Sequence, residues 1–299
     1  MAGPLAALAL ACGSAALADE SGPCAELGRQ VADAGKMDPR QVNQTLFKAA
    51  DRNCAPLADA LLQQGASVHA RDGLGRTALI HAARAGATET VRLLLDRGSA
   101  VDQAALNGSD ALFVAVEADK EATVEVLLSA HADVNRLGRS GLSPLAAAAF
   151  NADDEVAGLL LDRGADPTVA DATGKTAILY AAARGRAELV GRLLDRGIDP
   201  NQRYAHDLTA LMWAAGHPDE VTEPDALAVV GLLLQRGARV DDADDRGRTA
   251  LMIAAEQDHQ AIVARLLEAG AVADRRDHDG KTAYDLAAAS TREALSTPR

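Results

Sequence analysis

The sequence predicts an all-α solenoid built from stacked helix-turn-helix units. A short block related to Thr-Ala-Leu-x-x-Ala-Ala recurs along the 299-residue chain, and the recurrence is nearly periodic. The blocks begin 33 positions apart five times, then 40, then 33, at Gln44, Thr77, Asp110, Ser143, Thr176, Thr209, Thr249 and Thr282. A helical hairpin of this size cannot bury its apolar side alone, so the period indicates a stack in which each unit contacts only its neighbours.

Each block is expected to form the first helix of its unit. The hydroxyl of a residue such as Thr77 or Thr176 can accept a backbone N–H that has no partner within the helix, so these residues are suitable N-caps. Alanine pairs, such as Ala82–Ala83 and Ala181–Ala182, let neighbouring helices approach closely. A composition that is 48% hydrophobic, with one Trp, three Tyr and three Phe, suits such thin helix pairs.

A second helix follows each block and ends at a glycine. Its apolar residues have the spacing i, i+3, i+4, as in Val91, Leu94 and Leu95, which predicts one buried stripe. The glycines suit a left-handed C-terminal residue, and they are Gly65, Gly98, Gly164, Gly197, Gly237 and Gly270. The third unit has His131 instead, so it either tolerates that conformation or ends its helix differently.

Together, these features resemble ankyrin repeats, and more closely the exported bacterial proteins that contain an ankyrin-repeat domain. Turn residues such as Asp171 to Lys175 and Asp277 to Lys281 lie where the family has projecting β-turn fingers. The resemblance covers residues 44–299 as eight units, of which the last is truncated. It implies an all-α ankyrin-repeat solenoid with β-turn fingers.

The ends of the stack need protection from solvent. We expect residues 19–43 to form an N-terminal capping segment, with a helix around Cys24 to Ala34 and another beginning near Pro39. At the other end Tyr284 fits a first helix, while Pro298 leaves room for barely one turn of a second.

The family's usual Thr-Pro-Leu-His is not kept in this chain. Proline occurs in the block only at Pro144. The histidine position is occupied by Phe47, Ile80, Phe113, Ala146, Leu179, Met212, Met252 and Asp285. Apolar packing can replace the hydrogen bond between repeats that the family makes at this position.

The sixth unit carries seven extra residues, about Pro218 to Pro224, between its helices. Insertions in solenoids fall in loops because the stacked core cannot absorb them, so we expect an acidic, solvated loop. Two interpretations remain open: a tolerated length variant, or a loop that contacts a partner.

The first residues predict export. Residues 1–18 carry no charged side chain, are apolar from Leu5 to Leu17, and end in Ala16-Leu17-Ala18, like a secretory signal peptide with its cleavage site. No Lys or Arg precedes the apolar run. A lipoprotein anchored through Cys12 is the alternative.

Two cysteines remain after such a cleavage, Cys24 and Cys54. An even number in an oxidising compartment predicts a disulfide that ties the capping segment to the inter-helix turn of the first repeat, and two unrelated buried thiols are the alternative. Such a bond contributes about 2–4 kcal/mol to stability.

The composition argues against several classes of function. A net charge of -13 disfavours nucleic acids and anionic membranes, and the mature chain has no segment expected to span a membrane. The glycine needed earlier for a phosphate-binding loop is missing before Gly174-Lys175-Thr176. The seven histidines are scattered, and the nearest approach to a ligand cluster is His217 with Asp219 and Glu220, better explained as solvated loop residues. We therefore expect no cofactor, no metal and no enzymatic activity.

The resemblance places partner contacts on the fingers and on the exposed ends of the first helices, along the concave side. Repeats four to six carry aromatic and apolar residues there, and Trp and Tyr typically dominate the hot spots of protein interfaces. Tyr180 and Trp213 occupy equivalent places, so they either contact one another or serve ordinary packing between repeats. The candidate protein-binding residues are Leu142, Phe150, Tyr180, Tyr204, His206, Leu208, Trp213 and His217.

The sequence therefore predicts a non-catalytic, monomeric scaffold that binds or inhibits a protein partner in the bacterial periplasm or outside the cell. Three alternatives remain: a secreted effector that engages a host protein, a non-catalytic accessory subunit of an enzyme, and, more distantly, an enzyme with a hidden site. The identity of the partner does not follow from the fold.

Overall fold

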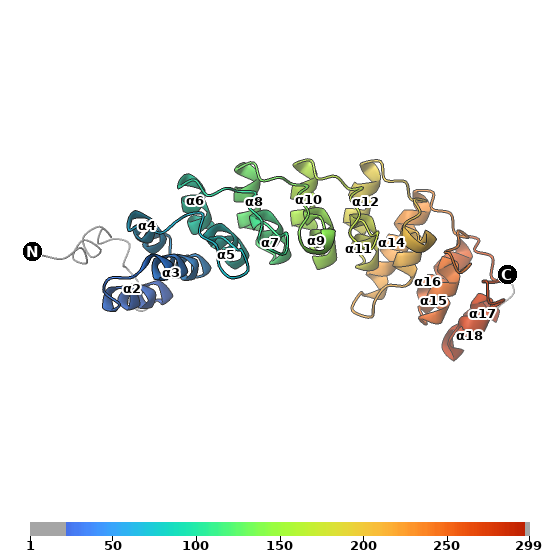
Figure 1. The fold of residues 1–299 in the computed structure, drawn as a ribbon. Coiled ribbons are helices and arrows are strands. Elements are labelled where there is room, and N and C mark those ends of the chain that lie inside the picture. Colours follow the sequence, from blue (N-terminus) through green and yellow to red (C-terminus); the bar gives the residue numbers. More distant parts are fainter. Residues whose placement is uncertain (1–21, 297–299) are drawn as a thin grey trace, which may run out of the picture. The chain divides into compact units, whose positions relative to one another are not determined.

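A computed structural model describes residues 22–296 (Figure 1). Contacts divide the chain into unit 1, residues 1–139, and unit 2, residues 140–299, and each is a stack of helical hairpins. The described residues form helices and no strand, apart from an isolated bridge between Ala243 and Thr249. The signal peptide predicted at residues 1–18, with Cys12, lies outside the described residues.

Unit 1 contains three hairpins preceded by one helix. The first helices α3, α5 and α7 pack side by side, as do the second helices α4, α6 and α8 (Figure 1). The helices are α2 (Pro23–Asp33), α3 (Pro39–Asp51), α4 (Ala55–Gln63), α5 (Ala78–Ala85), α6 (Thr88–Asp96), α7 (Ala111–Glu117) and α8 (Glu121–Ser129).

Unit 2 repeats this arrangement, with first helices α9, α11, α13, α15 and α17 and second helices α10, α12, α14, α16 and α18. Short 3-10 turns precede α9 and α13. The elements are η1 (Arg139–Gly141), α9 (Pro144–Asn151), α10 (Asp154–Asp162), α11 (Ala177–Ala183), α12 (Ala187–Asp195), η2 (Ala205–Asp207), α13 (Ala210–Ala215), α14 (Glu223–Gln235), α15 (Ala250–Glu256), α16 (Gln260–Glu268), α17 (Ala283–Leu286) and α18 (Ala289–Ser296).

The first residues of the blocks cap the first helices, with two exceptions. The Thr77 hydroxyl accepts the N–H of Ile80 at 3.3 Å, as predicted. Equivalent caps are Asp110, Ser143, Thr209, Thr249 and Thr282. The prediction for Thr176 is wrong, because its side chain accepts no capping hydrogen bond. Gln44 is not a cap either, since α3 begins earlier and is capped by Asp38.

The second helices end as their glycines predict. Gly98, for example, has φ of 85°, a left-handed value that glycine adopts without steric cost. His131 takes φ of 62° at the same place, so the third hairpin keeps the motif and bears the strain. In the apolar stripe Val91 and Leu94 are fully buried, whereas Leu95 is partly exposed at its edge.

The N-terminal helix α2 packs on α3 through Leu27 and Val31, which are 2% and 4% exposed. The expected second helix begins at Pro39, but it continues to Asp51 without interruption. A boundary at residue 44 therefore falls inside α3, and the capping segment 19–43 shares this helix with the first repeat.

Two expectations about the later repeats are wrong. The final helix α18 has eight residues, more than the single turn expected, because Ser290 and Thr291 anchor it by donating hydrogen bonds to Asp258. The insertion in the sixth unit is only partly a loop, because Thr222 caps a helix that begins at Glu223. The resulting α14 has 13 residues, whereas α12 has nine.

Candidate protein-binding face

The surface formed by α9, α11 and α13, with the turns that precede them, carries most of the predicted binding residues. We call it the inner face of unit 2. Phe150 at the end of α9 is 51% exposed, an unusual exposure for so large an apolar side chain. His206 is also exposed, and the partly exposed residues are Leu142, Tyr180, Tyr204, Leu208 and Trp213.

Aromatic rings and cations contact one another along this face. The rings of Phe150 and Tyr180 meet edge to face, with centroids 5.7 Å apart and an interplanar angle of 89°. The Lys175 Nζ lies 5.9 Å from the Tyr180 centroid and 5.1 Å from the Trp213 centroid. The Arg184 guanidinium lies 5.4 Å from the Phe150 centroid. Lys175 thus lies close to both Tyr180 and Trp213, for which the sequence left open a direct contact or ordinary packing between repeats.

Tyr180 is held in place by the turn before its helix. Its hydroxyl donates a short hydrogen bond to Asp171, which also accepts the N–H groups of Thr173 at 2.7 Å and Lys175 at 3.1 Å. Burial, together with this carboxylate, raises the pKa of Tyr180. Burial alone would raise the pKa of Asp171, but the donated hydrogen bonds outweigh it and the pKa is lowered. The turn and the ring are thereby fixed to each other.

The turn from Tyr204 to Leu208 is strained. His206 and Asp207 have φ of 63° and 57°, although the adjacent turns use Gly174 and Gly247 for left-handed positions. The strain is compensated by contacts with the next turn, where Asp245 lies 2.8 Å from His206 Nδ1 and donates its N–H to the His206 carbonyl at 3.0 Å. Burial raises the pKa of the Tyr204 phenol at the base of this turn.

The inclusion of His217 in the site is wrong. Its side chain is not a solvated loop residue, because His217 is only 8% exposed. The ring stacks on His259 of the next repeat, with centroids 3.9 Å apart and 3° between the planes. Nδ1 of His217 lies 3.0 Å from the Pro218 carbonyl oxygen. This histidine packs one repeat against the next.

Sequence reasoning missed Lys175 and Arg184 as members of the inner face. Lys175 immediately precedes the first residue of its block, the place that Leu142 and Leu208 hold in their units, so this position was the available signal. Arg184 gives no periodic signal. The turns of unit 1 also carry exposed leucines that sequence did not single out, Leu74 at 59% and Leu106 at 77%.

The comparison with protein families agrees with this geometry. A family model described as ankyrin repeats in three copies matches residues 46–138, 145–223 and 221–296. The chain belongs to the ankyrin-repeat family. No curated protein shows a significant match to it. Ankyrin repeats are generally protein-interaction modules and are typically non-catalytic.

This ankyrin chain replaces the usual histidine of the repeat with apolar packing. At that position Ile80, Phe113 and Leu179 are 1%, 0% and 1% exposed. Asp285 in the last repeat instead accepts the N–H of Thr282 in a capping box. At this position the repeats therefore pack through buried apolar side chains.

His81 lies between two carboxylates and stabilises the turn that precedes α5. His81 Nδ1 lies 3.0 Å from Asp51 and Nε2 lies 3.1 Å from Asp72. Burial opposes ionisation of Asp72, but hydrogen bonds from Arg76 and from the Leu74 N–H outweigh it and lower the pKa to about 2. Because His81 is 6% exposed, the network fixes the turn and offers no open site.

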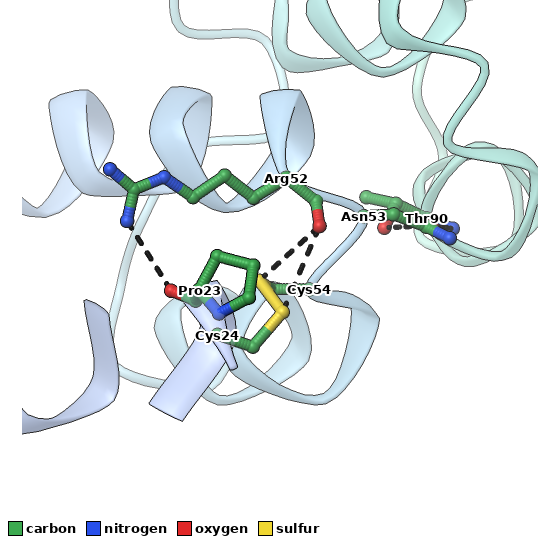
Figure 2. The surroundings of a disulfide bond; sticks show 6 residues. All are labelled: Pro23, Cys24, Arg52, Asn53, Cys54 and Thr90. Carbon is green, nitrogen blue, oxygen red and sulfur yellow. Dashed lines mark hydrogen bonds between the residues drawn. A yellow bond between two sulfur atoms is a disulfide. The ribbon is translucent and has the colours of Figure 1, made fainter. Parts of the chain in front are cut away.

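A disulfide joins Cys24 to Cys54, with Cα atoms 5.5 Å apart (Figure 2). Both sulfur atoms lie close to the Arg52 carbonyl oxygen, and the Arg52 guanidinium donates a 3.3 Å hydrogen bond to the Pro23 carbonyl. Beside Cys54, Asn53 accepts hydrogen bonds from the N–H and hydroxyl of Thr90 on α6. The bond thus ties α2 to the turn between α3 and α4, which is itself held by the next hairpin.

No group of three or more His, Cys, Asp or Glu side chains between residues 22 and 296 is arranged to hold a metal ion. Over the same residues, each helix is too short or too polar to cross a membrane.

Proposed function

We propose that this protein is a non-catalytic binding module that takes a protein partner on the inner face of unit 2. The contact residues proposed are Leu142, Phe150, Tyr180, Tyr204, His206, Leu208 and Trp213. The observation that carries the proposal is the half-exposed Phe150, continued by partly exposed rings on the two following first helices.

The physical reason is that exposed aromatic surface is costly in water and valuable at an interface. Large rings bury much apolar area, and their truncation at an interface often costs at least about 2 kcal/mol. The rings here are held in place, Tyr180 by Asp171 and Phe150 by Arg184, so binding requires little reordering of side chains.

The test is partner recovery from native extract by the full chain and by the double variant Phe150→Ala, Tyr204→Ala. We expect recovery to fall at least about tenfold. A matched control, Leu106→Ala with Val272→Ala, removes two exposed apolar side chains, 77% and 44% exposed, outside the inner face. Unchanged recovery by the folded double variant would reject this face.

We also propose that residues 1–18 direct export and that the mature chain works as a monomer in the bacterial periplasm. The support is the apolar leader-like segment together with the Cys24–Cys54 disulfide, which persists in oxidising compartments. The intact mass of protein purified from its native cell is the test. A chain beginning at Asp19 supports export, a lipid on Cys12 supports the lipoprotein, and an unprocessed cytoplasmic chain rejects both.

Fractionation separates the remaining alternatives. Retention in the periplasm supports the scaffold, whereas release into the medium together with binding to a host protein supports an effector. An enzyme activity that co-purifies with the chain and is absent from the isolated chain supports the accessory subunit.

A further inference from the structure

Two cations on the inner face of unit 2 have no carboxylate partner. Lys175 and Arg184 contact aromatic rings, and neither forms an ion pair with any residue in the range 22–296. This differs from the surrounding arginines. Arg186 pairs with Asp154 through two hydrogen bonds of 3.1 and 2.7 Å, and Arg248 pairs with Glu256 at 2.6 Å.

The nearest carboxylate in sequence, Asp171, forms no ion pair with Lys175 within the described residues. Asp171 already accepts the Tyr180 hydroxyl, the Thr173 hydroxyl and two backbone N–H groups. In a chain of net charge -13, these two cations lie beside aromatic rings without an ion-pair partner among the described residues, so both can pair with a carboxylate of a bound partner. A carboxylate placed between such rings makes a charge-assisted hydrogen bond in surroundings that hold less water than the open surface.

The two cations flank α11, one at each end. Lys175 and Arg184 are nine positions apart, which corresponds to about 13 Å along a helix. An extended peptide covers that distance in about four residues, and residues i, i+2 and i+4 of such a peptide point to the same side. The ring of Phe150, packed on Tyr180, lies on this face and offers apolar surface to the middle residue.

Building on the proposed function, we propose that the partner segment is acidic and extended. It carries carboxylates at i and i+4, which pair with Lys175 and Arg184, and an apolar side chain at i+2, which covers Phe150. Charge complementarity selects this occupant over a basic or purely apolar segment.

The acidic insertion of the sixth repeat allows a second test of the partner's charge, in which binding should become stronger instead of weaker. Val221 and Asp225 lie against Gly185, directly beside Arg184, and Asp219, Glu220 and Glu223 are exposed on the same insertion. These carboxylates repel an acidic segment and attract a basic one. Replacing Asp219 and Glu220 with Asn and Gln should therefore strengthen the binding of an acidic partner.

The experiment selects 12-residue peptides from a random phage-displayed library on the full chain, then measures synthetic versions by fluorescence anisotropy. We expect enriched peptides to be acidic with the i, i+2, i+4 pattern, and to lose at least about tenfold in affinity for Lys175→Glu, Arg184→Glu. The matched control, Arg163→Glu with Lys281→Glu, makes the same charge change away from the inner face and should leave affinity within about twofold. Circular dichroism verifies the folding of each variant.

The outcomes separate this inference from the proposed function. Enriched peptides that are neutral or basic, yet weakened by Phe150→Ala, overturn the acidic partner and leave the binding face intact. If no enriched peptide depends on Phe150, Lys175 or Arg184, both proposals are overturned. If the Lys175→Glu, Arg184→Glu variant and the matched control lose affinity equally, long-range electrostatics alone would explain the loss. The specific pairing of the peptide with Lys175 and Arg184 would then be overturned.

Discussion

The carboxylate of Asp110 accepts a 2.8 Å hydrogen bond from the backbone N–H of Phe113, although the Asp110 side chain is only 2% exposed. Burial raises its pKa to about 6, against the Phe113 hydrogen bond and the charge of Arg136, which lower it. The equivalent caps Thr77 and Ser143 are neutral. One cap of unit 1 is therefore a carboxylate that is ionised at neutral pH at a cost in stability.

Replacing this residue by Asn should stabilise the protein at neutral pH. The folded pKa lies above the unfolded value of about 3.9, so the stability that protonation contributes is fully present below about pH 4 and is lost as pH rises through about 6. We expect Asp110→Asn, which keeps a capping oxygen, to gain about 1–3 kcal/mol at about pH 7.5 and little at about pH 4. Urea unfolding of both proteins at each pH measures this, with Thr77→Asn as the pH-independent control. A difference that does not change with pH would contradict the account.

His131 is a candidate for stabilisation by glycine. Its left-handed backbone, with φ of 62°, costs a residue with a side chain about 1–2 kcal/mol. We therefore expect His131→Gly to raise the midpoint of thermal unfolding, and Gly98→Ala, at the equivalent place, to lower it by a similar free energy. A lower midpoint for His131→Gly would show that the imidazole makes contacts worth more than the strain.

Gly138 leaves room for the ring of Phe113. A Cβ built on Gly138 would overlap that ring, which is fully buried, so the side chains cannot move aside easily. We expect Gly138→Ala to destabilise unit 1 by about 1–3 kcal/mol. Gly231→Ala within α14 is the matched control, because its Cβ would meet nothing within 4 Å and should gain up to about 1 kcal/mol from helix propensity.

Reduction of the disulfide should weaken the N-terminal end. Cys24 and Cys54 close a loop with a sequence separation of 30, and such a bond typically contributes about 2–4 kcal/mol. Calorimetry with and without reductant measures the loss, and Cys24→Ser with Cys54→Ser should unfold at the same temperature under both conditions. Two titratable thiols in denatured, unreduced mature protein would show that the bond does not form.

The periodic features of the fold could be predicted from the sequence because they depend on residues within one repeat. The cap at Thr77 and the left-handed Gly98 are such local features, and both are present. The stack itself also follows, since each hairpin needs a neighbour to bury residues such as Val91 and Leu94.

Predictions failed where a residue's environment depends on another repeat. His217 is buried because His259 of the next repeat covers it, and no period in the sequence reveals that pairing. Lys175 belongs to the inner face because it lies over Tyr180 and Trp213, which come from two different helices. The composition of the insertion in the sixth repeat predicts a loop, but Thr222 caps a helix that begins within it.

The first and last helices of the described stack are held in different ways. A covalent link holds α2, whereas hydroxyl groups of Ser290 and Thr291 hold α18 to Asp258. Local unfolding should consequently be more frequent at α18 than at α2. Amide protons of α18 should therefore exchange with deuterated water faster than those of α2, and thiol-reducing conditions should bring the two rates closer together.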